Sequence, residues 1–362
     1  MNILLLSAYD AQSHQYWRKN LVQQFPAYHW TVLTLPARYF SWRIRGNSLS
    51  WSFTEKETLE RDYDLIIATS MCDLSALRGF VPHLATIPTI VYVHENQFAY
   101  PNSSDARKNV EPELLNLYTT LAADHVVFNS HYNQDSFFSG ADLLLQKLPD
   151  HIPTGLIETL KRKSSVIPVP LKDEHFCQHS THAGPLNILW NHRWEYDKGP
   201  DKLLATLRAL KQLTEKFTLH IIGQKFRTSP AEFDTIQSEF LAQIGQWGYV
   251  ESEADYRELL SRCDAVISTA EHDFQGLAIL EAVAAGCLPA TPNRLAYPEL
   301  LGAEYCYQSG DGEAEVLAKK LFKLVQLKRS NKLPFAPRIE HLGWKALRPD
   351  YQTLINQIAN RT

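Results

Sequence analysis

The chain has 362 residues, which is longer than one ordinary hydrophobic core and fits two domains of about 170 residues each. Its formal net charge of -4 excludes a protein that coats nucleic acid nonspecifically, although it allows a local basic face. The five cysteines are odd in number and widely scattered, without a Cys-x-x-Cys pair, so neither a zinc site nor a disulfide framework is indicated. No segment approaches the roughly 18 apolar residues of a membrane span, so we expect a cytoplasmic protein with reduced thiols.

The first part of the chain alternates strands with helices. Short apolar runs rich in β-branched residues predict strands, and helical spacing between several of them, as at 113–123, predicts crossover helices. The predicted strands are residues 2–8, 30–34, 65–69, 89–93 and 125–129. This alternation is typical of a parallel, doubly wound α/β sheet, in which ligands bind beyond the carboxyl ends of the strands. The polar loops that follow strands, and are expected at a ligand crevice, are 9–14, 70–73, 94–100 and 129–132.

The loop at 94–100 begins with His94, Glu95 and Asn96, directly after a predicted strand. A lone histidine in such a place is usually a buried residue with a structural role. A run of polar side chains at the edge of the crevice is better explained by ligand binding. By contrast, Asp62-Tyr63-Asp64 formally matches a metal-binding Asp-x-Asp motif, but it precedes a strand and is expected to be a turn.

Arginine alternates with aromatic residues in the segment TLPARYFSWRIRG, residues 34–46, where we expect a loop. The segment contains Arg38, Arg43 and Arg45 among Tyr39, Phe40 and Trp42. Arginines next to aromatic rings suit phosphate contact and base stacking on an RNA. The alternative is a solvated loop whose aromatic side chains pack on its own domain. A second basic spot at 161–163 is more often just a charged helix end.

The second part of the chain starts after a break in the pattern. Residues 173–184 are polar and rich in turn formers, which predicts a linker. From residue 185 the alternation of strand, loop and helix restarts and predicts a second doubly wound domain at 185–340. The last segment, 341–362, predicts an amphipathic helix.

Two cations, Arg193 and Lys198, lie on the loop between the first strand and the first helix of the second domain. Cations are mildly unfavourable at a helix start, so plain surface charge explains them poorly. Two fixed cations there can stabilise the negative charge that develops on a departing diphosphate, without a metal.

A strand is predicted in SRCDAVIS, residues 261–268, and the stretch 268–289 continues with an acidic loop and a helix. Gly276 lies where loop and helix join, and the N–H groups of a helix start can bind an anion there. Asp273 in the loop and Glu281 in the helix can hold two parts of one ligand on either side of that anion. The alternative is an ordinary strand, loop and helix of an α/β domain, with Glu281 as a solvated helix residue.

The residues D-F-Q-G-L-A-I-L-E at 273–281 resemble the E-x7-E signature of retaining GT-B glycosyltransferases of family 4, with Asp273 in place of the first glutamate. A narrower resemblance covers nearly the whole chain. The segments that are similar to the tRNA-queuosine α-mannosyltransferase family are TLPARYFSWRIRG, YVHENQFAYP, VVFNSHYNQDSF, KLPDHIP and NHRWEYDKGP. The chain departs from that family where Ala11-Gln12 precede Ser13-His14, since a Gly-Gly pair is usual there.

The resemblance implies a GT-B fold, in which two doubly wound Rossmann-like domains face each other across a cleft. The domain at 1–172 would bind the acceptor, the domain at 185–340 would bind the nucleotide sugar, and the helix at 341–362 would return to the first domain. The implied reaction is retaining transfer of mannose from GDP-mannose to queuosine at the wobble position of a tRNA, by resemblance tRNA-Asp. It implies no cofactor, no metal and no membrane partner, and it leaves the oligomeric state open.

The same resemblance implies roles for single residues. Arg193 and Lys198 would hold the diphosphate, Glu281 the ribose hydroxyls, and Asp273 and His94 the sugar. Further nucleotide contacts would come from Gly223, Tyr249, Phe274, Gln275, Gly276 and Leu277. Acceptor contacts would come from Ser13, His14, Arg38, Arg43, Arg45, Glu95, Asn96, Asn129 and Ser130.

Three other functions stay open on the sequence. A family 4 transferase with a lipid or polysaccharide acceptor often has a basic, hydrophobic helix for membrane docking, and we find none in the first domain. A queuosine-tRNA binding protein without chemistry would not need Arg193, Lys198 and Glu281. A sugar-nucleotide epimerase on the same fold should lack the basic aromatic segment at 34–46.

Overall fold

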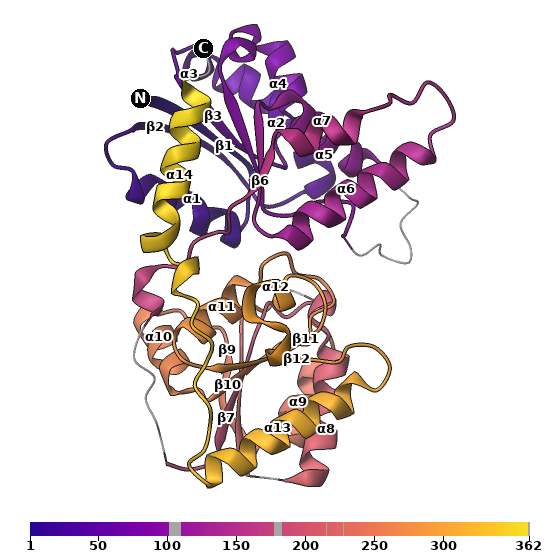
Figure 1. The fold of residues 1–362 in the computed structure, drawn as a ribbon, viewed down its shortest axis with the longest axis vertical. Coiled ribbons are helices and arrows are strands. Elements are labelled where there is room, and N and C mark those ends of the chain that lie inside the picture. Colours follow the sequence, from indigo (N-terminus) through magenta and orange to yellow (C-terminus); the bar gives the residue numbers. More distant parts are fainter. Residues whose placement is uncertain (101–109, 177–182, 215, 227, 361–362) are drawn as a thin grey trace. The chain divides into compact units, whose positions relative to one another are not determined.

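The computed structural model describes the chain except residues 101–109, 177–182, 215, 227 and 361–362. The described residues form two compact units (Figure 1). The first unit comprises Met1–Pro170 and Trp344–Thr362, and the second comprises Leu171–Gly343. Part of the expected linker at 173–184 lies outside the described residues.

The two segments by which the chain enters and leaves the second unit lie side by side. The Leu171 amide donates to the Leu342 carbonyl at 2.9 Å, and Leu171 forms a parallel bridge with Gly343. Directly after the entry point, Asp173–His175 form a short 3-10 turn, η2, where the sequence predicted only linker. Both ends of the second unit are therefore fixed by backbone hydrogen bonds within that unit.

The sheet of the first unit is parallel throughout, in the order β2-β1-β3-β4-β5-β6. Its strands are β1 (Asn2–Asp10), β2 (His29–Pro36), β3 (Leu65–Thr69), β4 (Thr89–Val93), β5 (His125–Phe128) and β6 (Ser164–Val166). The strands β3 and β4 are buried along their whole length, as expected of a parallel sheet that is covered on both faces. The predicted strands are confirmed, whereas β6 is short and polar and was not predicted.

Helices connect these strands and cover the sheet. They are α1 (Gln12–Gln24), α2 (Phe40–Thr54), α3 (Lys56–Leu59), α4 (Leu74–Phe80), η1 (Pro82–Thr86), α5 (Glu111–Ala122), α6 (His131–Gln146), α7 (Leu156–Arg162) and α14 (Trp344–Ala359). The last helix, α14, packs into the first unit through its apolar stripe: the hydroxyl of Tyr351 lies 3.1 Å from Trp17 Nε1 of α1 and 3.1 Å from the Pro168 carbonyl oxygen. This buried hydroxyl ties the C-terminal helix to α1 and to the end of the first unit.

Two predicted loops of the first unit are wrong. The expected loop at 9–14 shrinks to Ala11, because β1 continues its pairing with β2 as far as Asp10 and α1 begins at Gln12. The expected loop at 34–46 is largely the start of α2, whose inner face buries Ile44 and Trp51. Helix formation there is driven by this buried face, and not by the arginine and aromatic composition that suggested a loop.

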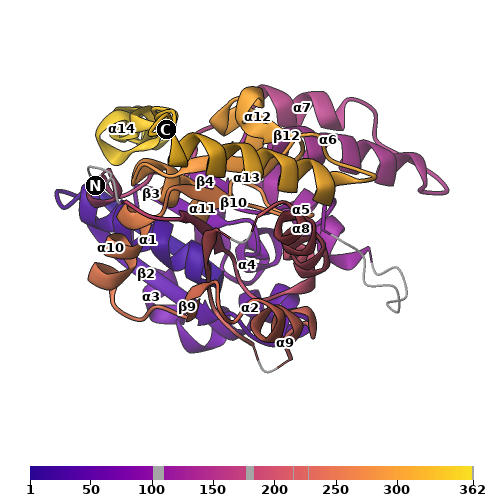
Figure 2. The same cartoon turned by 90° about the horizontal axis from the view of Figure 1, so that it is seen from below.

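The second unit repeats the architecture with the strand order β12-β11-β10-β7-β8-β9, and its strands are again parallel. Its strands are β7 (Leu186–Asn191), β8 (Phe217–Ile222), β9 (Ile244–Gly248), β10 (Ala265–Ile267), β11 (Leu288–Pro292) and β12 (Cys306–Tyr307). Its helices are η3 (Tyr196–Lys198), α8 (Pro200–Leu213), α9 (Glu232–Glu239), α10 (Glu253–Arg262), α11 (Leu277–Ala284), α12 (Tyr297–Leu301), η4 (Ala303–Tyr305), α13 (Glu313–Arg329) and η5 (Glu340–Leu342). Helices α8 and α13 pack side by side on the sheet (Figures 1 and 2).

Within each unit the strands are central and parallel, so their carboxyl ends meet at one edge of the sheet. Polar side chains follow these ends in both units, so the site has to be sought at the carboxyl edges of the two sheets.

Among the described residues, none of the helices combines the length and the apolar character that a membrane span requires.

Candidate functional site

Lys198 is buried at the end of the loop that follows β7. Its Nζ lies 2.5 Å from the His272 carbonyl oxygen, 3.1 Å from Asp197 Oδ2 and 3.9 Å from Asp273 Oδ2. The next residue, Gly199, has φ +64, and a Cβ there would lie 2.3 Å from the Thr269 carbonyl oxygen. The loop is thus packed tightly against the strand end of β10, and the ammonium group is held in one place by two carboxylates and a carbonyl.

Arg193 lies on the same loop in a different environment. Its side chain is 42% exposed, and its Nη2 lies 3.0 Å from Glu195 Oε2. One predicted cation is therefore buried and fixed, while the other is at the surface, where it can reorient toward an anion. Gly223, at the end of β8, allows this loop to pack: a Cβ there would lie 1.8 Å from the His192 carbonyl oxygen. The glycine is required by this packing, a reason that the sequence did not reveal.

Asp273 holds the start of α11. Its Oδ1 accepts from the Gly276 amide at 2.9 Å, and its Oδ2 accepts from the Tyr297 hydroxyl at 3.2 Å. Burial raises the pKa of Asp273, but the positive charge of Lys198, the nearby histidines and the Gly276 N–H outweigh it and lower the pKa below its ordinary value. Gly276 has φ +73, and a Cβ there would lie 2.8 Å from the Tyr297 ring. A carboxylate thus lies beside the N-terminus of α11, with the cation of Lys198 behind it.

A chain of buried hydroxyl groups connects Asp273 to His192. His192 Nε2 lies 3.0 Å from Ser268 Oγ, and Ser268 Oγ lies 2.9 Å from the Tyr297 hydroxyl that donates to Asp273. Burial, reinforced by the charge of Lys198, lowers the pKa of His192 to about 3, so the ring is neutral. Sequence reasoning missed these three supports of Asp273. Only His192 gave a signal, since it follows a strand directly and precedes Arg193.

Two side chains contact the Glu281 carboxylate. Its Oε2 accepts from the Tyr256 hydroxyl at 2.7 Å, and its Oε1 lies 3.3 Å from His175 Nε2. Asn191, at the end of β7, donates to the Tyr256 hydroxyl at 2.8 Å. Burial raises the pKa of Glu281, an effect that these neighbours partly offset. The alternative in which Glu281 is a solvated helix residue is wrong, because its side chain is only 12% exposed.

The other predicted nucleotide contacts differ in exposure. Phe274 and Gln275 are buried, and Phe274 packs edge-on against His272 with ring centroids 4.7 Å apart. Their side chains therefore shape the loop. Tyr249 is 53% exposed directly after β9, and Leu277 is half-buried at the first position of α11.

In the first unit, the tilted rings of His14 and His94 lie against each other at the carboxyl edge of the sheet. Their ring centroids are 4.3 Å apart, both are buried, and Trp17 and Tyr92 pack around His94. His14 Nδ1 lies 2.6 Å from the Tyr9 carbonyl oxygen. Burial, with a smaller contribution from His14, lowers the pKa of His94 well below its ordinary value, so its ring is neutral.

Three of the side chains predicted to contact the acceptor make hydrogen bonds within the loops. Asn96 donates to Asn133 Oδ1 at 2.8 Å and accepts from the Ala99 amide at 3.0 Å. Asn129 donates to the His94 carbonyl at 2.9 Å, and Ser130 caps α6 by accepting from the Asn133 amide at 3.0 Å. All three are buried. These hydrogen bonds hold the backbone at the carboxyl edge of the sheet, and contact with an acceptor stays a prediction. Ser13 is exposed and Glu95 half-buried.

The three arginines that were predicted to bind RNA differ in their surroundings. Arg43 is buried on the inner side of α2, and Arg45 is paired with Asp73 at 2.9 Å and with Glu111. Arg38 lies over the Tyr39 ring at 5.7 Å. Two of the three guanidinium groups thus serve the fold, because α2 is a helix that turns them toward the domain.

The remaining basic and acidic motifs have structural roles. Lys163 donates to the Leu121 carbonyl at 2.8 Å and to the Ala123 carbonyl, which secures the end of α5. Asp64 accepts from the Asn2 amide at 2.6 Å directly before β3. Among the described residues, no group of three or more His, Cys, Asp or Glu side chains could hold a metal ion.

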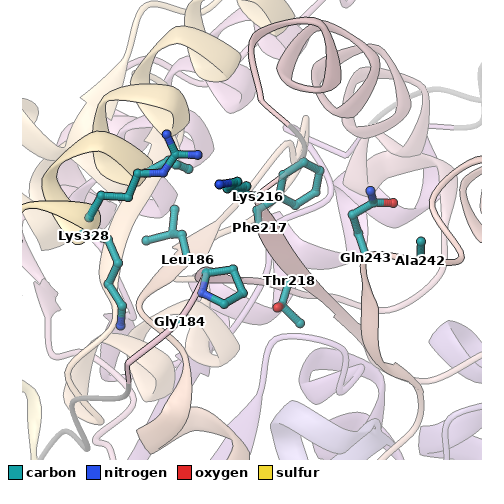
Figure 3. Close-up of a pocket in the computed structure, with 11 residues that line it drawn as sticks. Gly184, Leu186, Lys216, Phe217, Thr218, Ala242, Gln243 and Lys328 are labelled. Carbon is teal, nitrogen blue, oxygen red and sulfur yellow. The ribbon is translucent and has the colours of Figure 1, made fainter.

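A pocket of about 520 Å³ lies at the opposite edge of the second sheet (Figure 3). It is lined by Leu186 and Phe217, the first residues of β7 and β8, and by Lys328, whose Nζ lies 2.5 Å from Asp264 Oδ1. The charged groups described above follow the other ends of these strands. This pocket is therefore separate from them.

Comparison with solved structures identifies the fold. Sucrose-phosphate synthase from Thermosynechococcus elongatus superposes with a TM-score of 0.73 at 14% identity, over 100% of this chain and 99% of that one. HepE from Anabaena, in complex with UDP and glucose, gives a TM-score of 0.69 at 15% identity, over 99% and 100% of the two chains. Residues 171–333 match the family model of glycosyl transferases group 1. Together with the paired cations and the acidic loop before α11, this defines a glycosyltransferase of the GT-B fold.

The match of the first unit identifies a narrower family. Residues 2–171 match the family model described as tRNA-queuosine alpha-mannosyltransferase N-terminal. A Drosophila melanogaster protein named tRNA-queuosine alpha-mannosyltransferase is 32% identical over 340 residues, which are 91% of this chain and 88% of that protein. The chain belongs to the tRNA-queuosine alpha-mannosyltransferase family.

Proposed function

We propose that this protein transfers mannose from GDP-mannose to queuosine at the wobble position of a tRNA, by resemblance tRNA-Asp, with retention of the anomeric configuration. The observation that carries the proposal is the match of residues 2–171, most of the first unit, to the family model described as tRNA-queuosine alpha-mannosyltransferase N-terminal. The Drosophila relative, similar over 91% of the chain, carries the same name. The donor and the choice of tRNA are the finer parts of the proposal.

The second unit would bind the donor. Lys198 is fixed beside the N-terminus of α11, and Arg193 is exposed on the same loop, so both can face a diphosphate. Charge that develops on the β-phosphate is stabilised by such cations and by the N–H groups of a helix start. Asp273 would hold the sugar, and Glu281 would accept the ribose hydroxyls. Gly223, Tyr249 and the backbone at 274–277 would line the nucleotide.

In the first unit, we propose that His94 contacts the sugar. Among the described residues its Nε2 has no hydrogen-bond partner, although the ring is buried and neutral. A buried nitrogen without a partner costs free energy, and a sugar hydroxyl would satisfy it. His14, which lies against the same ring, and the exposed Ser13 would lie on the acceptor side.

The chemical step needs no strong base. The bond between the anomeric carbon and the phosphate oxygen breaks, and the acceptor hydroxyl oxygen forms its bond to the same carbon on the same face. The hydroxyl proton passes to the phosphate oxygen that leaves. The protein supplies fixed charge and position, and we propose that it requires neither a metal nor a cofactor.

The acceptor surface would include the start of α2. Tyr39 and Trp42 are 73% and 54% exposed, and Arg38 lies over the Tyr39 ring. The Trp42 indole lies over Gly46, where a Cβ would come within 2.4 Å of the ring. A glycine inside a helix costs about 1 kcal/mol relative to alanine, and at Gly46 it makes room for the indole to lie in this position. The half-exposed Trp42 ring would then offer a stacking surface for an RNA base.

Mass spectrometry of tRNA nucleosides tests the proposal. Queuosine-containing tRNA is incubated with the protein and, in separate reactions, with GDP-mannose, UDP-glucose and UDP-galactose, and the hydrolysed nucleosides are analysed. We expect a hexose added to queuosine only with GDP-mannose, and no addition to tRNA that lacks queuosine. Transfer from another nucleotide sugar would correct the donor, and no transfer from any donor to queuosine would refute the proposed function. A cytoplasmic location is part of the same proposal, since the acceptor is a tRNA.

A further inference from the structure

Glu281 is a buried acid that has no hydrogen bond from a lysine or arginine among the described residues. Its Oε2 accepts from the Tyr256 hydroxyl at 2.7 Å, and His175 Nε2 lies 3.3 Å from its Oε1. Both neighbours come from elements distant in sequence, Tyr256 from α10 and His175 from the turn η2. One carboxylate is thus held from two sides.

Both neighbours of the carboxylate are neutral. Burial lowers the pKa of His175, and this effect exceeds the opposite influence of Glu281, so the ring carries one proton. His175 Nδ1 has no hydrogen-bond partner among the described residues, which favours the tautomer with the ring proton on Nε2, the nitrogen that lies 3.3 Å from Glu281 Oε1. A tyrosine hydroxyl and a neutral imidazole fix the carboxylate without cancelling its charge.

The arrangement is poorly explained by stability alone. A buried carboxylate costs free energy, and an apolar side chain of similar volume often packs at least as well. An arginine in place of the two neutral donors would neutralise the charge and occupy both oxygens. The observed contacts leave each oxygen with a further lone pair and with an uncompensated negative charge.

We infer that His175 and Tyr256 are positioning residues that fix the Glu281 carboxylate so that its two oxygens accept from both hydroxyls of a vicinal diol, the ribose of the nucleotide. The inference rests on the proposed function, because it assumes that Glu281 faces a nucleoside diphosphate. It assigns a task to η2, the turn directly after the chain enters the second unit. Without the two donors the carboxylate would rotate, and the two hydrogen bonds to the diol would not form together.

The turn itself is anchored by surface ion pairs, and these provide a matched control. Lys172 lies 3.2 Å from Glu253, and Glu174 lies 2.8 Å from Arg257, so both pairs attach the turn to α10. Glu174 is 61% exposed. Replacing it disturbs the same turn but touches neither Glu281 nor its two donors.

The experiment compares binding of GDP and of 2′,3′-dideoxy-GDP by isothermal titration calorimetry. The variants are His175→Asn, Tyr256→Phe and the control Glu174→Gln, each checked by its melting temperature. We expect the wild type to prefer GDP by roughly tenfold to a hundredfold, as for hydrogen bonds to a charged acceptor. In His175→Asn and Tyr256→Phe the preference should fall to about threefold or less, mainly through weaker binding of GDP, while Glu174→Gln keeps it.

The outcomes separate the inference from the proposed function. A preference that survives in both variants, or an equal loss of affinity for both nucleotides, overturns the positioning role. If the wild type itself shows no preference for the diol, the ribose role of Glu281 is wrong and the inference fails with it. If the wild type binds UDP and not GDP, the proposed donor is wrong, and the same comparison with UDP and its 2′,3′-dideoxy analogue tests the inference.

Discussion

Replacement of Lys198 by methionine tests the centre of the proposed donor site, because it removes the charge and keeps the apolar stem. In the folded protein the ammonium group lies 3.1 Å from Asp197 and 3.9 Å from Asp273. At an effective dielectric constant of about 20, these distances correspond to gross attractions of roughly 5 and 4 kcal/mol. Desolvation offsets much of this, and the loss of one partner from a buried pair costs about 3–5 kcal/mol. A variant that is clearly less stable is therefore expected.

Loss of stability and loss of catalysis can be separated with a second variant. Lys198→Met with Asp197→Asn removes one of the two stranded carboxylate charges, so part of the lost stability should return. Turnover should stay at least about 100-fold below wild type in both variants, since the charge that stabilises the departing diphosphate is absent. Urea unfolding measures the free energy of unfolding, and mass spectrometry of the modified nucleoside measures the single-turnover rate.

The result that would refute this reasoning is a double variant in which turnover recovers together with stability. Lys198 would then only neutralise buried carboxylates. Near-normal turnover in the single variant would refute the catalytic role in the same way. Asp197→Asn alone serves as the control, because it leaves the cation in place.

Arg193→Ala should lower turnover by roughly 100-fold with little effect on stability, since the side chain is 42% exposed; a near-normal rate would remove Arg193 from the phosphate site. Transfer activity should persist in EDTA, and activity that is lost in EDTA and restored by magnesium or manganese would show that a metal acts after all. Trp42→Ala should weaken tRNA binding without changing its dependence on salt, whereas Arg38→Ala should reduce the slope of log affinity against log salt by about one unit. The affinity for GDP serves as the control. Unchanged tRNA binding in both variants would place the RNA surface elsewhere. Burial raises the pKa of Glu313, but hydrogen bonds from Arg294, Lys202 and the Gly310 amide outweigh it and lower the pKa from 4.5 to about 2. Ionised Glu313 therefore adds roughly 3 kcal/mol to the free energy of unfolding above pH 4.5, and this is lost as the pH falls toward 2. Glu313→Gln should make the free energy of unfolding in urea less dependent on pH over this interval, and an unchanged pH dependence would contradict the assignment.

Much of the second unit could be predicted from the sequence. Strand β7, the loop with Arg193 and Lys198, and the helix that begins after Gly276 all depend on local signals: apolar runs, glycine and helical spacing. These signals act between residues near in sequence. The class of fold followed from them, because alternating strands and helices form parallel sheets whose carboxyl ends meet at one edge.

The same reasoning failed where long-range packing decides the local structure. The segment at 34–46 reads as a basic loop, but the buried side chains of Ile44 and Trp51 make most of it part of α2 and turn Arg43 inward. Composition does not reveal which face of a helix will be covered. An amphipathic helix can be recognised in a sequence only when apolar residues recur every three to four positions, and α2 lacks such a pattern.

The sequence by itself thus determined the architecture and the order of the charged motifs along the chain. Only the tertiary structure decided which groups stand behind them: Tyr297 behind Asp273, and His175 and Tyr256 behind Glu281. The physical reason is that a hydrogen bond between side chains from separate elements leaves no periodicity in the sequence. The protonation states follow the same rule, since burial sets the neutral form of His175 and the surrounding positive charges set the ionised form of Asp273.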